Sequence, residues 1–260
     1  MNKFLPILLL LSACAREITE REAVDARIQF DLGVEQLSKG NVPAALSAFM
    51  ASEKLDPSFP DLHSGLGLVY ISIRRYDDAE RHFRIALELK PGYSDARNNL
   101  GMLYLIQEKW DKAIDEFRVA LQDVLYATPS HAEGNMGYAY YRKGDKTKAI
   151  RHLKNATLVN PKFCRGYMWL GEIFQASAEL KDAERYLDRF VERCLLDPNL
   201  KASIDASATS EVYMRLGQVT LAKGDAPRAR SAFKSCVDAG RDTPHYDYCD
   251  ESMKKLPAGE

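Results

Sequence analysis

Cysteines are the residues of this sequence whose type and spacing most clearly allow chemistry. The chain of 260 residues has five of them. Cys14 lies near the amino terminus, and Cys164, Cys194, Cys236 and Cys249 lie in the second half of the chain. A thiol can be acylated, oxidised to a disulfide or bound to a metal ion. The position of each cysteine therefore decides which of these reactions applies to it.

The first 13 residues are organised like the export signal of a bacterial lipoprotein. Lys3 supplies a positive charge, and residues 4–11 form an apolar run that is too short to span a bilayer. The run ends in Leu-Ser-Ala immediately before Cys14. We therefore predict that residues 1–13 are removed and that Cys14 is lipidated, which anchors the mature chain to a membrane. The alternative is an ordinary secretory signal that leaves a free thiol. The polar residues 14–25 are expected to form a tether.

A 34-residue pattern of small, large and helix-breaking residues recurs along the rest of the chain. Within residues 60–93, Gly67 is in the eighth place, Ala79 in the twentieth and Pro91 in the thirty-second. Glycine recurs in the eighth place at Gly33, Gly67, Gly101, Gly137, Gly171 and Gly217. Alanine recurs in the twentieth place at Ala45, Ala79, Ala113, Ala149, Ala183 and Ala229. A fixed period of this length indicates an array of helix–turn–helix units. The small residues allow two helices to approach closely, and the proline ends the second helix.

These units resemble tetratricopeptide repeats, although His63 stands where the repeat usually has an aromatic residue. The resemblance implies an all-α fold, a solenoid of six helix–turn–helix repeats that forms a right-handed superhelix. The repeats are expected at residues 26–59, 60–93, 94–127, 130–163, 164–197 and 210–243. The insertion at residues 198–209 is expected to extend the helix that follows it. Residues 244–260 are expected to cap the apolar end of the array.

The repeat positions favour one of the three possible pairings of the four remaining cysteines. Cys164 opens the first helix of the fifth repeat and Cys194 closes the second helix, so antiparallel packing places them side by side. Cys236 lies late in the last helix pair, 13 residues before Cys249 in the tail. We therefore predict the disulfides Cys164–Cys194 and Cys236–Cys249, which fit an exported chain.

The sequence predicts neither an enzyme nor a cofactor. It has no nucleophile elbow, no phosphate loop and no pair of carboxylates that repeat packing leaves unexplained. Zinc is the rival explanation for the cysteines and histidines. No Cys-x-x-Cys motif occurs, and the histidines are spread over several repeats, so we expect no metal site. The histidines are His63, His82, His131, His152 and His245.

Three asparagines suggest a clamp for a peptide carboxylate, which some tetratricopeptide repeats contain. They are Asn98, Asn99 and Asn135. The lysines that complete such a clamp are missing from the neighbouring repeats. The sequence therefore favours solvated polar residues on the helix surface.

The expected binding surface is the concave groove of the solenoid. In tetratricopeptide arrays the second, fifth, ninth, twelfth and thirteenth places of each first helix line this groove. The apolar residues in these places are Phe30, Val34, Leu37, Leu68, Ile71, Met102, Leu105, Ile106, Tyr138 and Tyr141. We predict that they bind an amphipathic helix or strand of a partner. The alternative is that they belong partly to the core or are covered by the tether. Leu32 and Leu66 are expected to fill packing places on the same helices.

The junction between the third and fourth repeats has a more specific resemblance. It contains Q-D-V-L-Y at residues 122–126, then Pro129, then N-M-G-Y at residues 135–138. Together with the export signal and the six repeats, it resembles the type IV pilus pilotins, the PilF, PilW and Tgl lipoproteins. The chain length and the cysteine positions favour the Tgl branch. The resemblance implies a lipid-anchored protein on the periplasmic face of the outer membrane. Such a protein binds secretin subunits, promotes their assembly into the pilus pore and supports twitching motility.

The composition is ordinary for a protein that folds in water, with 46% hydrophobic residues, 28% charged residues and a net charge of −1. This balance gives no electrostatic reason to expect a nucleic acid as partner. Nor does any motif indicate a small-molecule substrate. Two other classes of function stay open. One is a general periplasmic scaffold for outer-membrane protein or cell-wall assembly, and the other is a hydrolase or a regulator of one.

Overall fold

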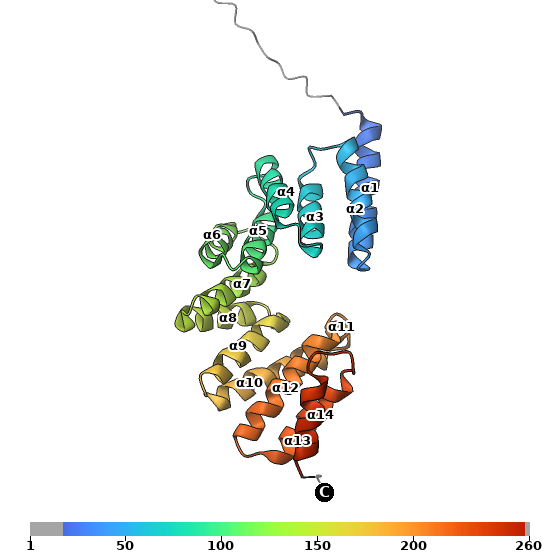
Figure 1. The fold of residues 1–260 in the computed structure, drawn as a ribbon. Helices are drawn as coiled ribbons and strands as arrows, with labels where there is room; N and C mark the ends of the chain where they lie inside the picture. Colours follow the sequence, from blue (N-terminus) through green and yellow to red (C-terminus); the bar gives the residue numbers. More distant parts are fainter. Residues whose placement is uncertain (1–17, 258–260) are drawn as a thin grey trace, which may run out of the picture. The chain divides into compact units, whose positions relative to one another are not determined.

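The computed structural model describes residues 18–257, and every regular element in this part of the chain is a helix (Figure 1). The prediction of an all-α array of helix pairs is confirmed. The chain forms two compact units, which meet in the sequence between Pro91 and Gly92. The predicted export signal and Cys14 lie outside the described residues. None of the described helices is long and apolar enough to cross a membrane.

The first unit contains two helical hairpins. Its helices are α1 (Glu20–Ser38), α2 (Val42–Leu55), α3 (Pro60–Ser72) and α4 (Tyr76–Leu89). α1 packs against α2, α3 packs against α4, and α2 also contacts α3. Each hairpin therefore corresponds to one of the predicted repeats.

The array begins earlier than we expected, because α1 starts inside the predicted tether at residues 14–25. Thr19 caps the helix: its hydroxyl accepts a hydrogen bond from Glu22 N at 3.2 Å, and the Glu22 carboxylate accepts one from Thr19 N at 3.0 Å. This reciprocal capping box satisfies two backbone N–H groups at the start of the helix. The Thr-x-x-Glu spacing is visible in the sequence and is the signal that marks the true start of α1.

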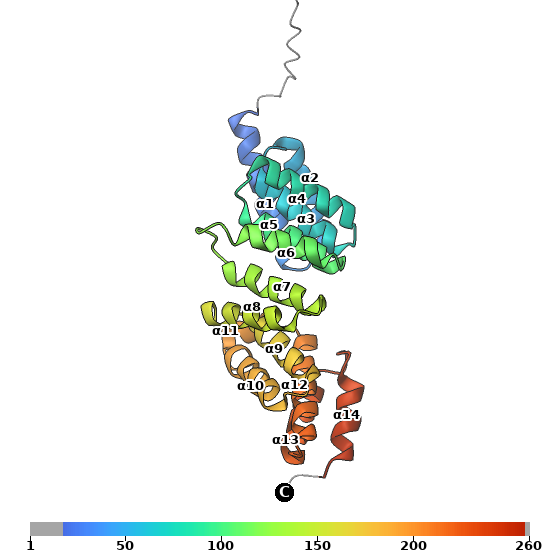
Figure 2. The same cartoon turned by 90° about the vertical axis from the view of Figure 1, so that its left-hand side faces the viewer.

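The second unit contains four hairpins and several shorter elements (Figure 2). The first two hairpins are α5 (Ser94–Ile106) with α6 (Trp110–Ala120), and α7 (Pro129–Arg142) with α8 (Lys146–Val159). The third is α9 (Cys164–Ala176) with α10 (Leu180–Phe190), followed by a π-helical turn, η1 (Val191–Leu195), and by α11 (Pro198–Lys201). The last is α12 (Ala206–Ala222) with α13 (Ala226–Asp238), followed by α14 (Tyr246–Lys255). α14 lies along α13, in the position expected for a capping tail.

The insertion at residues 198–209 contains two helix starts, whereas we expected one extended helix. Asp197 caps the short helix α11 by accepting a hydrogen bond from Asn199 N at 3.0 Å. Asp205 caps α12 by accepting one from Ala208 N at 2.7 Å. Only the last part of the insertion therefore extends α12. The expectation was wrong for the first part, because the sequence offers a second N-cap only eight residues after the first.

Each hairpin is closed by contact between the eighth-place glycine and a large residue of the second helix. A Cβ atom added to any of the six glycines would lie less than 3.0 Å from a side-chain carbon of that residue. For Gly67 the distance to Phe83 Cε1 would be 2.4 Å. The partners, in chain order, are Phe49, Phe83, Phe117, Leu153, Leu187 and Phe233, and all six are fully buried. The two helices can adopt this spacing only because the glycine has no side chain.

The fifteenth place of every repeat ends the first helix with a positive φ. Glycine occupies it in three repeats, at Gly40, Gly144 and Gly224. In the other three repeats Arg74, Glu108 and Ala178 adopt φ values of 60°, 57° and 58°. A left-handed residue is the usual way to reverse the chain after a helix. The repeat geometry therefore imposes this conformation even where the sequence provides a residue with a Cβ atom.

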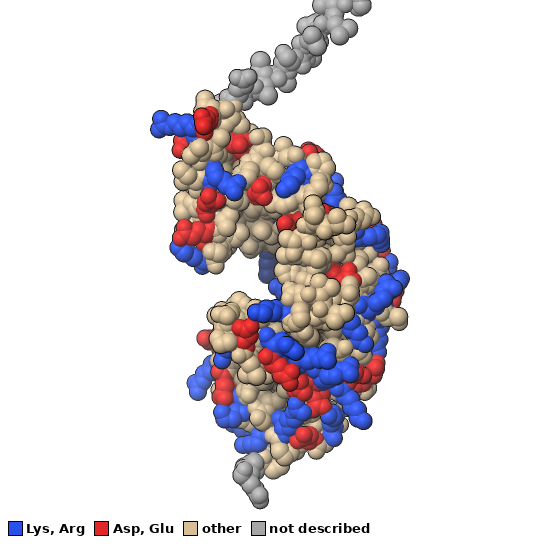
Figure 3. Space-filling view, turned by 180° about the vertical axis from the view of Figure 1, so that it is seen from behind, with Lys and Arg blue, Asp and Glu red and all other residues tan. Residues whose placement is uncertain are grey.

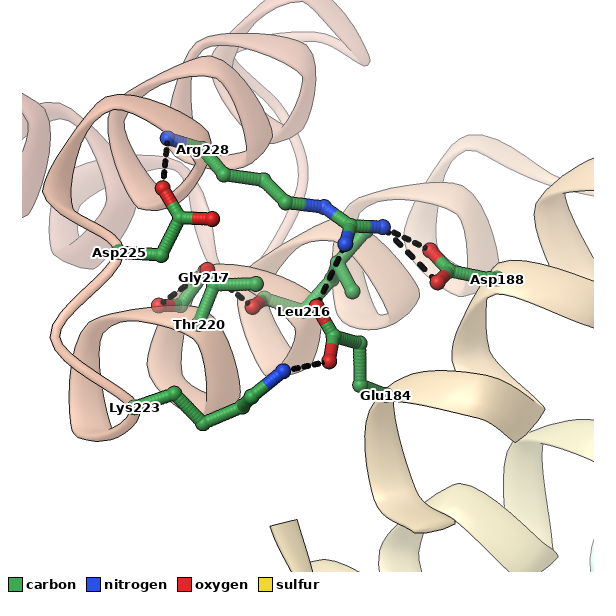
Figure 4. A network of polar contacts seen from close by, with 8 residues as sticks. All are labelled: Glu184, Asp188, Leu216, Gly217, Thr220, Lys223, Asp225 and Arg228. Carbon is green, nitrogen blue, oxygen red and sulfur yellow. Dashed lines mark hydrogen bonds and ion pairs between the residues drawn. The ribbon is translucent and has the colours of Figure 1, made fainter. Parts of the chain in front are cut away.

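A polar network joins the fifth and sixth repeats across the insertion (Figure 4). Glu184 of α10 is almost buried, and it is paired with Lys223 and Arg228. The Arg228 guanidinium donates to Glu184 Oε1 at 2.5 Å and to both Asp188 oxygens at 2.7 and 2.8 Å. Bidentate pairs of this kind fix the relative position of two helices. The insertion therefore does not loosen the contact between α10 and the last hairpin.

Two disulfides staple the carboxyl-terminal part of the second unit. Cys164 at the start of α9 is bonded to Cys194 in η1, with 6.0 Å between their Cα atoms. Cys236 of α13 is bonded to Cys249 of α14, with 6.1 Å between their Cα atoms. This is the connectivity predicted from the repeat positions. The second bond holds the capping helix α14 against the end of the array.

The glycine contact predicts the effect of a single methyl group. Gly67→Ala should destabilise the first unit by about 1–2 kcal/mol, because overpacking costs about 1–3 kcal/mol and alanine recovers up to about 1 kcal/mol of helix propensity. Urea denaturation of the purified variant measures this loss. Gly92→Ala is the control, since an added Cβ there meets no atom within 4 Å. Equal stability of Gly67→Ala and the parent protein would contradict the packing argument.

The disulfides predict a specific peptide map. Digestion under non-reducing conditions should give one peptide pair that contains Cys164 and Cys194 and another that contains Cys236 and Cys249. The bonds close loops of 30 and 13 residues. Removing either should therefore cost about 3–4 kcal/mol in the chain-entropy model. Free thiols at these positions, or crossed peptide pairs, would refute the connectivity.

Candidate partner-binding site

The residues predicted for the groove are all at least partly accessible. Val34 and Ile106 are exposed, and the other eight are half-buried. The adjacent packing places of the same helices behave differently, since Leu66 and Leu100 are buried. The groove residues of the first unit are Phe30, Val34 and Leu37 on α1 and Leu68 and Ile71 on α3. Those of the second unit are Met102, Leu105 and Ile106 on α5 and Tyr138 and Tyr141 on α7.

Two residues of α1 differ from the expectation. Phe30 packs against Phe49 and Phe59, with ring centroids 5.7 and 4.8 Å away, so part of its ring belongs to the core. Leu32 was expected in the core but is 41% exposed. The corresponding place in the second repeat, Leu66, is fully buried. The first repeat has no preceding helix pair among the described residues, and Leu32 therefore remains uncovered.

The groove face of α7 continues into an aromatic cluster. Tyr138 stacks on Trp169 of α9, with 4.6 Å between ring centroids, and lies 6.4 Å from Tyr141. Its hydroxyl accepts a hydrogen bond from Arg142 at 3.1 Å. Tyrosine and tryptophan provide a large, rigid contact area at a low entropic cost. Sequence reasoning missed Trp169, which occupies a repeat place that the groove pattern does not include.

A pocket of about 720 Å³ lies within the second unit. Its walls come from α5, α7 and α9 on one side and from the insertion and the start of α12 on the other. Of the predicted groove residues, Met102 lines this pocket. The other principal lining residues are Asn98, Asn135, Arg165, Met168, Leu200, Ile204 and Glu211. Leu200 and Ile204 belong to the insertion, so the insertion forms one apolar wall of the pocket.

Asn98 and Asn135 form an amide pair in this pocket. Asn135 Nδ2 donates a hydrogen bond to Asn98 Oδ1 at 3.2 Å, and the two residues are 7% and 5% exposed. They are therefore not the solvated surface residues that we expected. This bond uses the NH₂ group of Asn135 and the carbonyl oxygen of Asn98. The NH₂ group of Asn98 and the carbonyl oxygen of Asn135 are left for a ligand. An extended peptide backbone offers the complementary N–H and C=O groups.

The polar groove places of the later repeats are connected through Arg215. Its guanidinium donates to Glu211 Oε1 at 2.8 Å and to Gln175 Oε1 at 3.2 Å. Gln175 donates in turn to Gln218 at 2.8 Å. Burial raises the pKa of the Glu172 carboxyl above its usual range, although Arg215 lies 3.8 Å away and opposes this shift. These polar groove places therefore form a preorganised polar surface.

The junction at residues 122–126 presents two apolar side chains to solvent. Val124 is 95% exposed and Leu125 is 87% exposed. Asp123 holds the loop, because its carboxylate accepts hydrogen bonds from the Ser94 hydroxyl at 2.6 Å and from Leu125 N at 2.9 Å. These bonds keep the pKa of Asp123 below its usual value. Tyr126 is buried and anchors the other end. The loop is therefore an ordered structure with an apolar tip.

Among the described residues, one cluster could also hold a metal ion. It consists of Glu53, His63 and His82, which come from α2, α3 and α4 of the first unit. No residue of the cluster belongs to the predicted groove.

Solved structures with the same fold include PilW and PilF. PilW is described as a widely conserved type IV pilus biogenesis factor. It shares 20% identity and a TM-score of 0.73 over 86% of this chain and 97% of its own. The other is PilF of Pseudomonas aeruginosa, with 18% identity and a TM-score of 0.72 over 89% of this chain and 99% of its own. Cut9, from a complex with Hcn1 of the APC/C, also has a TM-score of 0.73, at 18% identity. It matches 91% of this chain but only 43% of its own length.

The sequence itself matches a family model. No curated protein sequence matches the chain significantly. The model for the tetratricopeptide repeat matches residues 64–132 and 135–198, which together are just over half of the chain. With the helix pairs and the glycine contacts described above, this match shows that the protein belongs to the tetratricopeptide-repeat family.

Proposed function

We propose that this protein is a pilotin, a lipid-anchored protein on the periplasmic face of the outer membrane. It binds secretin subunits through its groove and promotes their assembly into the pore of the type IV pilus. The observation that carries this proposal is that the apolar groove residues of each unit remain accessible, although the core places Leu66 and Leu100 beside them are buried. The likeness to PilW, a type IV pilus biogenesis factor, supports the choice of pathway.

The fold alone does not select this partner. PilW and Cut9 have the same TM-score with the chain, although PilW is a type IV pilus biogenesis factor and Cut9 is part of the APC/C. The features that favour a pilotin are therefore those outside the repeat signature. They are the ordered junction loop with its apolar tip and the predicted lipidation of Cys14 after the export signal at residues 1–13. A general periplasmic scaffold also needs an export signal, but it does not need the junction loop.

Surface charge agrees with a protein partner. On the face shown in Figure 3, acidic and basic side chains intermingle over the second unit and do not gather into a patch of one sign. The net charge of the whole chain is −1. Binding to nucleic acid depends on a strongly basic surface, which this face lacks. Apolar contact in the groove is therefore the main source of affinity in the proposed function.

Anchoring should be separable from folding. We expect Cys14→Ser to give a folded periplasmic protein that no longer fractionates with membranes, because the helical array begins only after Thr19. Membrane fractionation and circular dichroism of the same preparation measure the two properties. If the variant still sediments with the outer membrane in a strain that lacks the secretin, the lipid-anchor assignment is wrong.

Charge in the groove should block assembly without unfolding the protein. Val34→Lys, Leu37→Lys and Leu68→Lys should leave the secretin as monomers and abolish twitching motility, because each replaces a contact of about 1.5–3 kcal/mol with a charge. The melting temperature should change little, since a lysine stem can lie along partly exposed apolar surface.

A matched control distinguishes the effect of a charge in the groove from the effect of a charge elsewhere on the unit. Leu89→Lys introduces the same charge at an exposed leucine at the end of α4, outside the groove places. It should support normal secretin assembly. A fall of many degrees in the melting temperature of the groove variants would show that these residues belong to the core. Normal secretin multimers in all three groove variants would refute the proposed function.

A further inference from the structure

The core of the first unit contains two histidines that repeat packing does not require. His63 occupies the fourth place of the second repeat, where an aromatic residue is usual, and His82 occupies the twenty-third place. They are 3% and 2% exposed. Their rings stack at a centroid distance of 5.3 Å, and Tyr70 covers His82 at 5.2 Å. Buried imidazoles need partners for both ring nitrogens, and these partners define their chemistry.

The hydrogen bonds fix the protonation of His63. Its Nε2 atom lies 2.8 Å from the carbonyl oxygen of Pro57, which can only accept, so Nε2–H donates. The Nδ1 atom of His63 therefore carries a lone pair, which accepts a hydrogen bond from Nδ1–H of His82, 3.0 Å away. A histidine that donates one N–H to a backbone carbonyl and offers the other nitrogen is arranged like a metal ligand with its outer support.

Glu53 supplies a third ligand atom. Its carboxylate oxygen lies 3.9 Å from His63 Nδ1, and the ligand atoms of all three residues lie within 4.8 Å of one another. Bond lengths of about 2.0–2.1 Å in a tetrahedral zinc site place ligand atoms roughly 3.3 Å apart. The histidine nitrogens are close to this spacing. The Glu53 side chain is about one-third exposed and can move the remaining distance.

We propose that Glu53, His63 and His82 form a Zn²⁺ site with two imidazoles, one carboxylate and a fourth position open to water. The ion joins α2, α3 and α4 and so links the first two repeats of the array. When zinc binds, the proton of His82 moves from Nδ1 to Nε2 and Nδ1 becomes a ligand. This change of tautomer releases no proton. This site revises the expectation from the sequence that the chain binds no metal.

The fourth repeat provides a natural comparison within the same chain. Glu133 and His152 occupy the same repeat places as His63 and His82, and their side chains meet at 3.0 Å. In the third repeat, the place that corresponds to Glu53 is held by Leu121. This second pair therefore lacks the third ligand, and it should not bind zinc tightly.

Isothermal titration of the tag-free mature protein with Zn²⁺, after treatment with a chelator, tests the site. We expect one saturable site per chain in the parent protein and in His152→Gln. In Glu53→Gln and His82→Gln the affinity should fall by at least about tenfold. Zinc should also raise the melting temperature of the parent protein and not that of Glu53→Gln.

Two outcomes would overturn the proposal. One is the absence of saturable zinc binding in the parent protein. The other is unchanged affinity in Glu53→Gln, which would show that zinc binds elsewhere. Because Glu53 is partly exposed, this variant should fold even if replacing a buried histidine unfolds the unit. Nitrogen-15 chemical shifts of the histidine rings add a direct readout. Coordination of His63 and His82 through Nδ1 is expected, and coordination of both through Nε2 would contradict the geometry.

Discussion

The contact between a glycine on the first helix of each repeat and a large side chain on the second is the constraint on which the structure depends. At Gly67 the absent Cβ would lie 2.4 Å from the ring of Phe83. The same contact recurs in all six hairpins, with phenylalanine in four and leucine in two. It brings the two helices close enough for the alanine of the twentieth place to be fully buried as well. The 34-residue period of the sequence results from the repetition of this contact in each hairpin.

This packing also determines which surfaces are left for binding. The core places of each first helix face the second helix or a neighbouring repeat, so the groove places of the same helix contribute less to the core. Val34 and Leu68 can therefore be apolar and accessible without a cost to the core. The exception is α1, where Leu32 is exposed because no earlier repeat covers it within residues 18–257. A groove residue and an uncovered core residue can have similar exposed fractions. Only their places within the repeat distinguish the two kinds of residue.

The elements predicted from the sequence are those that the period specifies. The helix pairs, their turns and the Cys164–Cys194 bond follow from places within one repeat, and the Cys236–Cys249 bond follows from the short separation of its members in the sequence. The amide pair of Asn98 and Asn135 was not predicted, because its members are 37 residues apart and on different repeats. The pocket wall at Leu200 and Ile204 was missed for a related reason. An insertion has no place in the repeat register, so its position depends on local caps and tertiary packing.

The start of α1 was missed although its signal is local. Thr19 and Glu22 form a capping box, but the repeat frame predicts the first repeat only from residue 26 onward. A periodic pattern indicates the positions of the packing contacts that all repeats share. It does not indicate how far a terminal helix extends beyond those contacts. Local capping rules and the repeat period therefore give independent information about the same helix.

The two units are stabilised by different covalent means. The second unit has both disulfides: one joins the two ends of the fifth hairpin, and the other holds α14 at the carboxyl-terminal end of the array. The sequence from residue 18 to residue 91 contains no cysteine, so the first unit depends on side-chain packing and on polar contacts between its helices. Glu53, His63 and His82 are placed where a cross-link would be most useful, because they come from three different helices of that unit. A metal ion can be removed by a chelator and bound again, whereas a disulfide is broken only by reduction. The first unit also contains the apolar groove of α1 and α3, and its stability would then respond to zinc while that of the disulfide-bonded end would not.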